Sequence, residues 1–156
     1  MAHVEKTIEV EQPVDKVYAQ WTQFEDFPKF MENVEQVKQL DDKHLEWKAK
    51  VVGTERQWKA EIVEQQPNRV IAWRSITGDR NDGKVEFQPV NGHTKVKLMV
   101  DYDPPAGAAG EVGDKLIQAT PGRVENDLKR FKDFIEKRQT PTGAWSGEIR
   151  SGQVKK

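Results

Sequence analysis

The stretch "WTQFEDFPKFM", residues 21–31, carries an aromatic ring at every third position. A step of three residues turns a side chain by roughly 300° around a helix axis, and it alternates faces along a strand. Neither a straight helix nor a strand can therefore gather these four rings on one side. Pro28 also disfavours the helical conformation at Phe27. The stretch predicts a helix that breaks near Gln23, followed by a short second helical piece at an angle to the first.

A strand and a helix are expected before this break. "HVEKTIEV", residues 3–10, alternates apolar and polar side chains, which is typical of a strand. The next apolar residues recur at spacings that place them on one helical face. They are Val14, Val17, Tyr18 and Trp21. Pro13 suits the first position of this helix, where its missing N–H group costs nothing.

From Asn33 to Asp103 the pattern has period two, which predicts about six further strands separated by turn residues. In "RVIAWRSIT" both phases carry apolar residues, and we favour Ile71 and Trp73 inward with Arg74 outward. In the other runs charged residues fill the outward phase. One apolar and one charged face indicate an antiparallel sheet with one side in water.

A long amphipathic helix closes the pattern. Val124, Leu128, Phe131 and Ile135 form its apolar stripe. Pro121-Gly122 marks either its start or a kink in a longer helix. We expect residues 110–120 to act with Phe27 and Phe30 as a gate. The tail segment "GAWSGEI", residues 143–149, is expected either to dock on its own domain or a neighbouring subunit, or to stay solvated.

Composition sets the broad class of the protein. A chain of 156 residues favours one domain, residues 1–138, followed by a polar tail, residues 139–156. The net charge of −1 argues against a nucleic-acid partner. No apolar run has the length of a membrane span, and the start of the chain does not resemble a signal peptide. Cysteine is absent, so a cytoplasmic location is expected.

An antiparallel sheet of about seven strands must cover its apolar face, and the C-terminal helix is the only long amphipathic element available. A curved sheet and one helix rarely fit flush, so we expect an internal cavity between them. The predicted ligand-binding residues share the inward phase of facing elements or belong to the aromatic stretch. They are Trp21, Phe27, Phe30, Trp47, Trp58, Trp73, Phe87, Leu98, Tyr102, Val124, Leu128 and Phe131. For the aromatic stretch, a plug of the core remains the alternative.

Three segments carry a resemblance to a known superfamily. They are "WTQFEDFPKFMENVEQVKQLD", "HLEWKAKVVGTERQWKAEIVEQQPNRVIAWRS" and "VENDLKRFKDFIEKR". In this order they resemble the SRPBCC or START-like superfamily, and within it the polyketide cyclase/dehydrase branch and coenzyme Q-binding proteins. The resemblance implies an α+β helix-grip fold, with two short helices after the first strand and a deep pocket against the long helix. It also implies a lipid, quinone or polyketide-like ligand, and it supplies no catalytic motif.

Residues for catalysis or metal binding are not evident. His3, His44 and His93 have no metal-ligand spacing, and neither a catalytic residue nor a cofactor is predicted. The leading hypothesis is binding or carriage of a small hydrophobic molecule without catalysis. A cyclase or dehydratase is the alternative, and it would need an acid or base inside the pocket. A module that binds a protein partner is the third possibility, and the tail could support a homo-oligomer.

Overall fold

The computed structural model describes the backbone of residues 2–51, 54–78, 80–103 and 110–155; within these ranges the side chains of residues 2, 51, 54 and 110–119 are not described. The elements in chain order are β1 (Ala2–Val10), α1 (Val14–Trp21), the 3-10 helix η1 (Phe24–Lys29), β2 (Val34–Gln39), β3 (His44–Val51), β4 (Thr54–Gln66), β5 (Val70–Thr77), β6 (Asn81–Val90), β7 (His93–Tyr102), α2 (Gly110–Arg138), β8 (Glu148–Arg150) and β9 (Gln153–Lys155).

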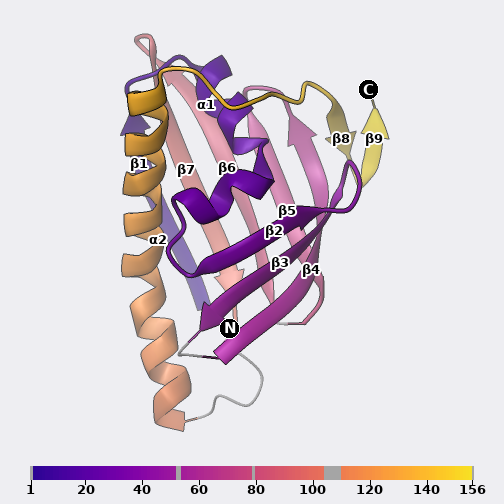
Figure 1. Ribbon diagram of the computed structural model, residues 1–156, viewed down its shortest axis with the longest axis vertical. Helices are drawn as coiled ribbons and strands as arrows, with labels where there is room; N and C mark the ends of the chain where they lie inside the picture. Colours follow the sequence, from indigo (N-terminus) through magenta and orange to yellow (C-terminus); the bar gives the residue numbers. More distant parts are fainter. Residues whose placement is uncertain (1, 52–53, 79, 104–109, 156) are drawn as a thin grey trace.

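One antiparallel sheet curves around the long helix α2 (Figure 1). Its strand order is β1-β7-β6-β5-β4-β3-β2, and the tail adds β8 to β4 and β9 to β8. The β6–β7 hairpin turns at Asn91 and Gly92, both with positive φ, as expected for an Asn-Gly turn. The predicted α+β helix-grip fold is confirmed, with two more strands than the seven expected.

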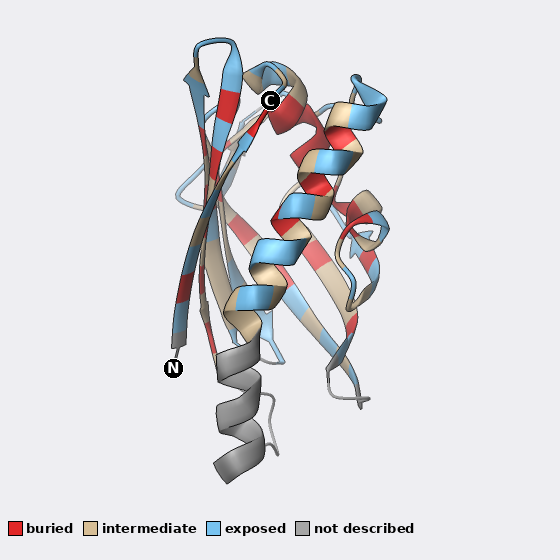
Figure 2. Cartoon of the chain, turned by 90° about the vertical axis from the view of Figure 1, so that its left-hand side faces the viewer, coloured by how far each residue is buried: buried red, intermediate tan, exposed pale blue. Residues whose placement is uncertain are grey.

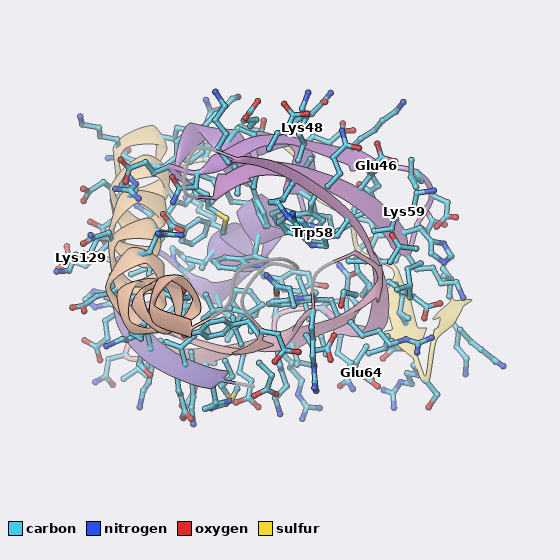
Figure 3. All side chains as sticks on the ribbon, turned by 90° about the horizontal axis from the view of Figure 1, so that it is seen from below. Glu46, Lys48, Trp58, Lys59, Glu64 and Lys129 are labelled. Carbon is cyan, nitrogen blue, oxygen red and sulfur yellow. The ribbon has the colours of Figure 1, made fainter. Side chains whose placement is uncertain are left out.

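The sheet has the two chemically different faces that its alternation predicts. Along β7, Thr94, Val96, Leu98, Val100 and Tyr102 are buried, whereas Lys95, between the first two, is exposed. Figure 3 shows Trp58 directed into the space enclosed by the sheet and α2, with charged side chains such as Lys48 and Lys129 on the outside. Burial follows one stripe along α2 (Figure 2), which contains Leu128, Phe131 and Ile135. The core therefore lies between the concave face of the sheet and this stripe.

The aromatic stretch is broken where the sequence predicts. Helix α1 ends at Trp21, and the tighter helix η1 follows with Pro28 inside it. All four rings are buried. The ring of Trp21 meets that of Phe131 edge-on, with 4.8 Å between centroids, and Phe30 meets the other side of Phe131 at 5.2 Å. The break lets two short helices turn their rings toward α2 from different directions.

Helix α2 runs from Gly110 to Arg138 and contains Pro121. The alternative of one longer helix is therefore the one observed, and Pro121 is not its first position. The predicted gate involves residues 110–120; the side chains of residues 110–119 lie outside those described, and the gate stays a prediction.

The tail docks on its own domain, which confirms one of the predicted alternatives. In Figure 1 it crosses from the end of α2 to β8 beside β4. The backbone N–H of Thr142 donates to Oε1 of Gln20 at 2.9 Å, and the Gln20 amide donates back to the Thr142 hydroxyl at 3.2 Å. Further along, Ile149 pairs with Gln65 and is completely buried. A homo-oligomer formed through this tail stays a prediction.

Truncating Phe30 should destabilise the fold. Phe30 is 2% exposed and contacts Phe27, Phe131 and Phe134. Phe30→Ala is expected to lower the free energy of unfolding by about 3–5 kcal/mol, as full truncations of buried Phe do. Urea unfolding followed by circular dichroism measures the change. Leu40→Ala removes an exposed side chain and should stay within about 0.5 kcal/mol of wild type. A loss for Phe30→Ala no larger than that of the control would contradict the assigned packing.

Candidate functional site

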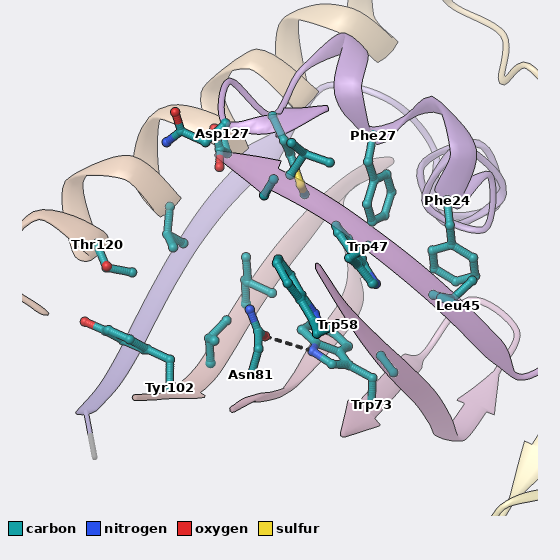
Figure 4. A pocket seen from close by; sticks show the side chains of 18 of the residues that line it. Phe24, Phe27, Leu45, Trp47, Trp58, Trp73, Asn81, Tyr102, Thr120 and Asp127 are labelled. Atoms are coloured by element: carbon teal, nitrogen blue, oxygen red, sulfur yellow. Dashed lines mark hydrogen bonds between the residues drawn. The ribbon is translucent and has the colours of Figure 1, made fainter. Parts of the chain in front are cut away.

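A cavity of about 260 Å³ lies between the sheet and α2. Its wall is contributed by α1, η1, strands β2 to β7 and α2, and most of its residues are aromatic or aliphatic (Figure 4). Nine of the predicted binding residues line it: Trp21, Phe27, Trp47, Trp58, Trp73, Leu98, Tyr102, Val124 and Leu128. Their role in holding a ligand stays a prediction, but the structure brings all nine together around one space.

Three predicted residues lie behind the wall instead. Phe87 packs edge-on against Tyr18, with ring centroids 5.4 Å apart, and Phe131 lies between Trp21 and Phe30. Phe30, Phe87 and Phe131 are all at most 5% exposed. Phe87 and Phe131 share the inward phase of the wall residues, but the ring of Trp21, which itself lines the cavity, packs against both of them. Phe30, which is expected to act in the gate, does not line the cavity, and its role in a gate stays a prediction.

Three indoles form the centre of the wall. Trp47 and Trp58 are direct partners across β3 and β4, and their rings stack with 4° between planes and 5.9 Å between centroids. The indole N–H of Trp73 donates to Oδ1 of Asn81 at 3.2 Å, which fixes the third ring (Figure 4). Gly83 makes room for it, because a Cβ there would lie 2.6 Å from the Trp73 ring. The indoles therefore form a rigid apolar wall.

The cavity has a polar end. In Figure 4, Asn81, Tyr102, Thr120 and Asp127 lie on one side, opposite Phe24, Phe27 and Leu45. The remaining polar wall residues are Asn33, Arg80, Asp103 and Arg123. Arg80 is exposed and Arg123 half-buried, whereas Phe24 and Phe27 are buried. The solvent side of the cavity is therefore its polar end.

Asp127 is the ionisable wall residue with a shifted pKa, and the sequence analysis missed it. Burial raises its pKa above the ordinary value, and hydrogen bonds from Arg130 and the backbone amide of Glu32 offset part of the effect. Asp127 lies three residues after Val124 and four before Phe131, so it belongs to the apolar stripe. That spacing was the available signal, hidden by the many charges of the helix.

A curved antiparallel sheet gripping one long helix, with a cavity between them, defines the helix-grip class of proteins. Residues 10–125, more than half of the chain, match the family described as "polyketide cyclase / dehydrase and lipid transport". The chain belongs to this family.

One relative and several solved structures are similar to this chain. An uncharacterized 17.2 kDa protein of Streptomyces lincolnensis, from the melC2–rnhH intergenic region, is 42% identical over 96% of this chain and 99% of its own length. A START superfamily protein from Mycobacterium smegmatis has a TM-score of 0.73 at 15% identity, covering 88% of this chain and 99% of that one. The Zhui aromatase/cyclase from Streptomyces sp. R1128 has a TM-score of 0.70 at 20% identity, covering 92% and 98%. At these identities the two structures show the fold alone.

Among the described residues, no cluster of three or more His, Cys, Asp or Glu side chains could hold a metal ion. None of the helices in the described ranges is both long and apolar enough to cross a membrane.

The raised pKa of Asp127 should make stability depend on pH. A carboxyl whose pKa is raised by folding binds its proton more tightly in the folded state. Its contribution to the free energy of unfolding therefore falls as the pH rises from the unfolded value, near 3.8, through the folded pKa. Asp127→Asn should remove this fall. Urea unfolding of wild type and Asp127→Asn across acidic pH gives the free energy of unfolding of each protein as a function of pH. The difference between the two curves is the contribution of Asp127.

Asp133→Asn is the control for this experiment, because Asp133 is an exposed carboxylate on the same helix. We expect it to leave the pH dependence of wild type in place. Parallel curves for wild type and Asp127→Asn would mean that the Asp127 carboxyl is not desolvated by folding.

Proposed function

We propose that this protein binds and carries a small, mostly apolar molecule in the cavity between the sheet and α2. The observation that carries the proposal is the composition of the wall, in which Trp47, Trp58 and Trp73 adjoin Leu98 and Leu128. Burying apolar ligand surface against such residues is favourable by about 25 cal/mol per Å². Polar groups gathered at one end would set the orientation of the ligand, as a few polar groups commonly do in apolar pockets.

The size and polarity of the cavity narrow the ligand class. A volume of about 260 Å³ lies just below the roughly 300–1,000 Å³ of pockets for drug-sized molecules. This favours a compact ring system, quinone-like or polyketide-like, over a lipid with two acyl chains. Asn81, Tyr102 and Thr120 could hydrogen-bond oxygen atoms at one end of such a molecule. The ligand of this proposal is therefore flat and apolar, with oxygen atoms at the edge that faces the solvent side.

A cyclase or dehydratase remains the second candidate, and Asp127 favours it. A carboxyl on the cavity wall with a raised pKa is the kind of group that can donate or accept a proton there. The same observation fits a carrier, because a protonated carboxyl can also donate a hydrogen bond to a ligand oxygen. The two candidates differ in whether the bound molecule leaves unchanged.

The remaining parts of the proposal concern the setting of the protein. We propose a cytoplasmic location, supported by the absence of cysteine and the mixed surface charge. A homo-oligomer is compatible with the docked tail, because β8 and β9 add strands at the rim of the sheet. A protein-binding groove is less well supported, because the solvent side of the cavity carries polar residues such as Arg80 and Arg123 rather than an exposed apolar rim.

Native mass spectrometry of freshly purified protein is the direct test. We expect a fraction of the protein to carry one small molecule, which organic extraction should release. Chromatography of the extracted molecule before and after incubation with the protein distinguishes a carrier from an enzyme, because a carrier leaves the molecule unchanged. An empty protein that also fails to bind added quinones and polycyclic aromatics would overturn the proposal.

Filling the cavity should abolish binding. Leu98 lines the cavity from β7, whereas its neighbour Met99 lies on the opposite face of the same strand. Leu98→Trp should weaken binding of an environment-sensitive apolar fluorophore at least tenfold, because the larger ring occupies ligand space. Met99→Trp adds a similar ring outside the cavity and should leave the affinity unchanged. Equal affinities for wild type and Leu98→Trp would place the fluorophore elsewhere.

A further inference from the structure

A second cavity, of about 210 Å³, lies beneath the C-terminal tail. Phe24 lines both cavities, so its ring forms a partition between them. The character of the second space is different, because its other wall residues include Thr22, Gln23, Gln39, Gln65 and Trp145. None of the described residues on its wall is charged. Its outer edge, at Gln39 and Ala144, is exposed, whereas Gln65 is 1% exposed. The polar surface therefore extends from solvent into the protein.

A β-bulge brings Gln65 to this position. Along β4 the buried residues are Ala60 and Ile62, which share one phase, and then Gln65, which belongs to the other. The register against β5 shifts between Ile62 and Glu64, so β4 contains one extra residue there. Without this residue Gln65 would point outward, because a shift by one reverses the face of every later side chain. The extra residue therefore turns a polar side chain into the interior.

The amide of Gln65 lacks a partner for either of its polar atoms. Both its Nε2 and its Oε1 are buried without a hydrogen bond to any described group, and so is the hydroxyl of Tyr18. The Tyr18 hydroxyl lies near this amide, although the geometry falls short of a hydrogen bond. Burial also raises the pKa of Tyr18 to about 12, so the hydroxyl stays neutral. Buried polar groups in folded proteins nearly always have partners, so the Gln65 amide, which lines the cavity, points to a molecule that completes it.

The C-terminal tail covers the second cavity. One end of the covering segment is held by the paired hydrogen bonds between Thr142 and Gln20, and the other by the strand pairing of Ile149 with Gln65. Between these anchors Trp145 packs over Gly147, where a Cβ would lie 2.4 Å from its ring. The tail therefore places the indole of Trp145 on the wall of the cavity, at a position fixed by these two attachments.

We propose that this second cavity is a binding site for a small, neutral, planar molecule that presents a hydrogen-bond donor and acceptor side by side, such as a cyclic amide. The carboxamide of Gln65 is complementary to such an edge, because it offers both a donor and an acceptor. The indole of Trp145 and the ring of Phe24 supply apolar surface for a flat ring. The uncharged wall excludes an ion, which would lose its hydration without compensation.

Uracil and 1,3-dimethyluracil are matched probes, because the second has the same ring without N–H donors. Titrations of the full-length protein followed by 1H–15N NMR report the indole signal of Trp145 and the side-chain amide of Gln65. We expect uracil to shift both signals saturably, and dimethyluracil to bind at least tenfold more weakly. Gln65→Met keeps the length of the side chain, removes its hydrogen-bond donor and acceptor, and should weaken uracil binding at least tenfold.

Gln66→Met is the matched control, because the neighbouring Gln66 donates to Glu64 and lies outside the cavity. It should bind uracil like wild type. Thermal unfolding without a probe checks the fold of Gln65→Met, whose melting temperature should be no lower than that of Gln66→Met. Trp145→Leu is a second variant that is expected to weaken uracil binding.

Several outcomes would overturn the proposal. One is the absence of a shift at the solubility limit of uracil, and another is equal binding of both probes. A crystal structure grown with uracil that contains ordered water only would show that the cavity is a hydration site. A marked drop in the melting temperature of Gln65→Met would mean that the amide serves the fold. Because these measurements do not involve the larger cavity, a failure here leaves the proposed carrier function standing.

Discussion

The edge-to-face contact between Trp21 and Phe131 joins α1, near the start of the chain, to α2, near its end. The rings lie 4.8 Å apart, and Phe131 is completely buried. Aromatic pairs in this geometry are worth more than their buried area alone. Because Phe30 packs on the other side of Phe131, the short helices α1 and η1 are fixed against α2 at one end of the sheet. Trp21 lines the cavity whereas Phe131 and Phe30 do not, so this aromatic packing forms one end of it.

Periodicity in the sequence predicted which face each residue occupies, and this was sufficient for the architecture. The alternation that places Trp47 and Trp58 on one face, and the stripe through Val124 and Leu128, hold in the structure. Periodicity could not predict which of the inward-facing side chains reach the cavity and which are covered by other residues. Phe87 and Leu98 share a phase, but only Leu98 reaches the cavity, because packing of the helices decides which side chains are covered.

Two polar residues escaped prediction for different physical reasons. Asp127 lies on the apolar stripe of α2, but a carboxylate among many charges is expected to face water. Gln65 is inward only because the bulge in β4 shifts its phase, and a bulge depends on pairing with β5 that a single sequence does not reveal. Irregular backbone is where period-based reasoning fails, and irregular backbone is also common near functional sites.

Polar groups inside the molecule lower its stability unless something binds them. Asp127 recovers part of this cost through Arg130, whereas the Gln65 amide and the Tyr18 hydroxyl have no partner among the described residues. A chain selected for stability alone would place apolar side chains at such positions. The stability lost through these buried polar groups fits a protein whose interior binds other molecules.

The stacked pair formed by Trp47 and Trp58 has an optical consequence. Two indoles with nearly parallel planes, 5.9 Å apart, are close enough for their electronic transitions to couple. Coupled transitions produce paired circular dichroism bands of opposite sign, which single indoles do not. Both rings line the larger cavity, so a molecule placed against them alters this coupling directly. The protein thus carries a built-in chromophore whose spectrum reports the occupancy of its own interior.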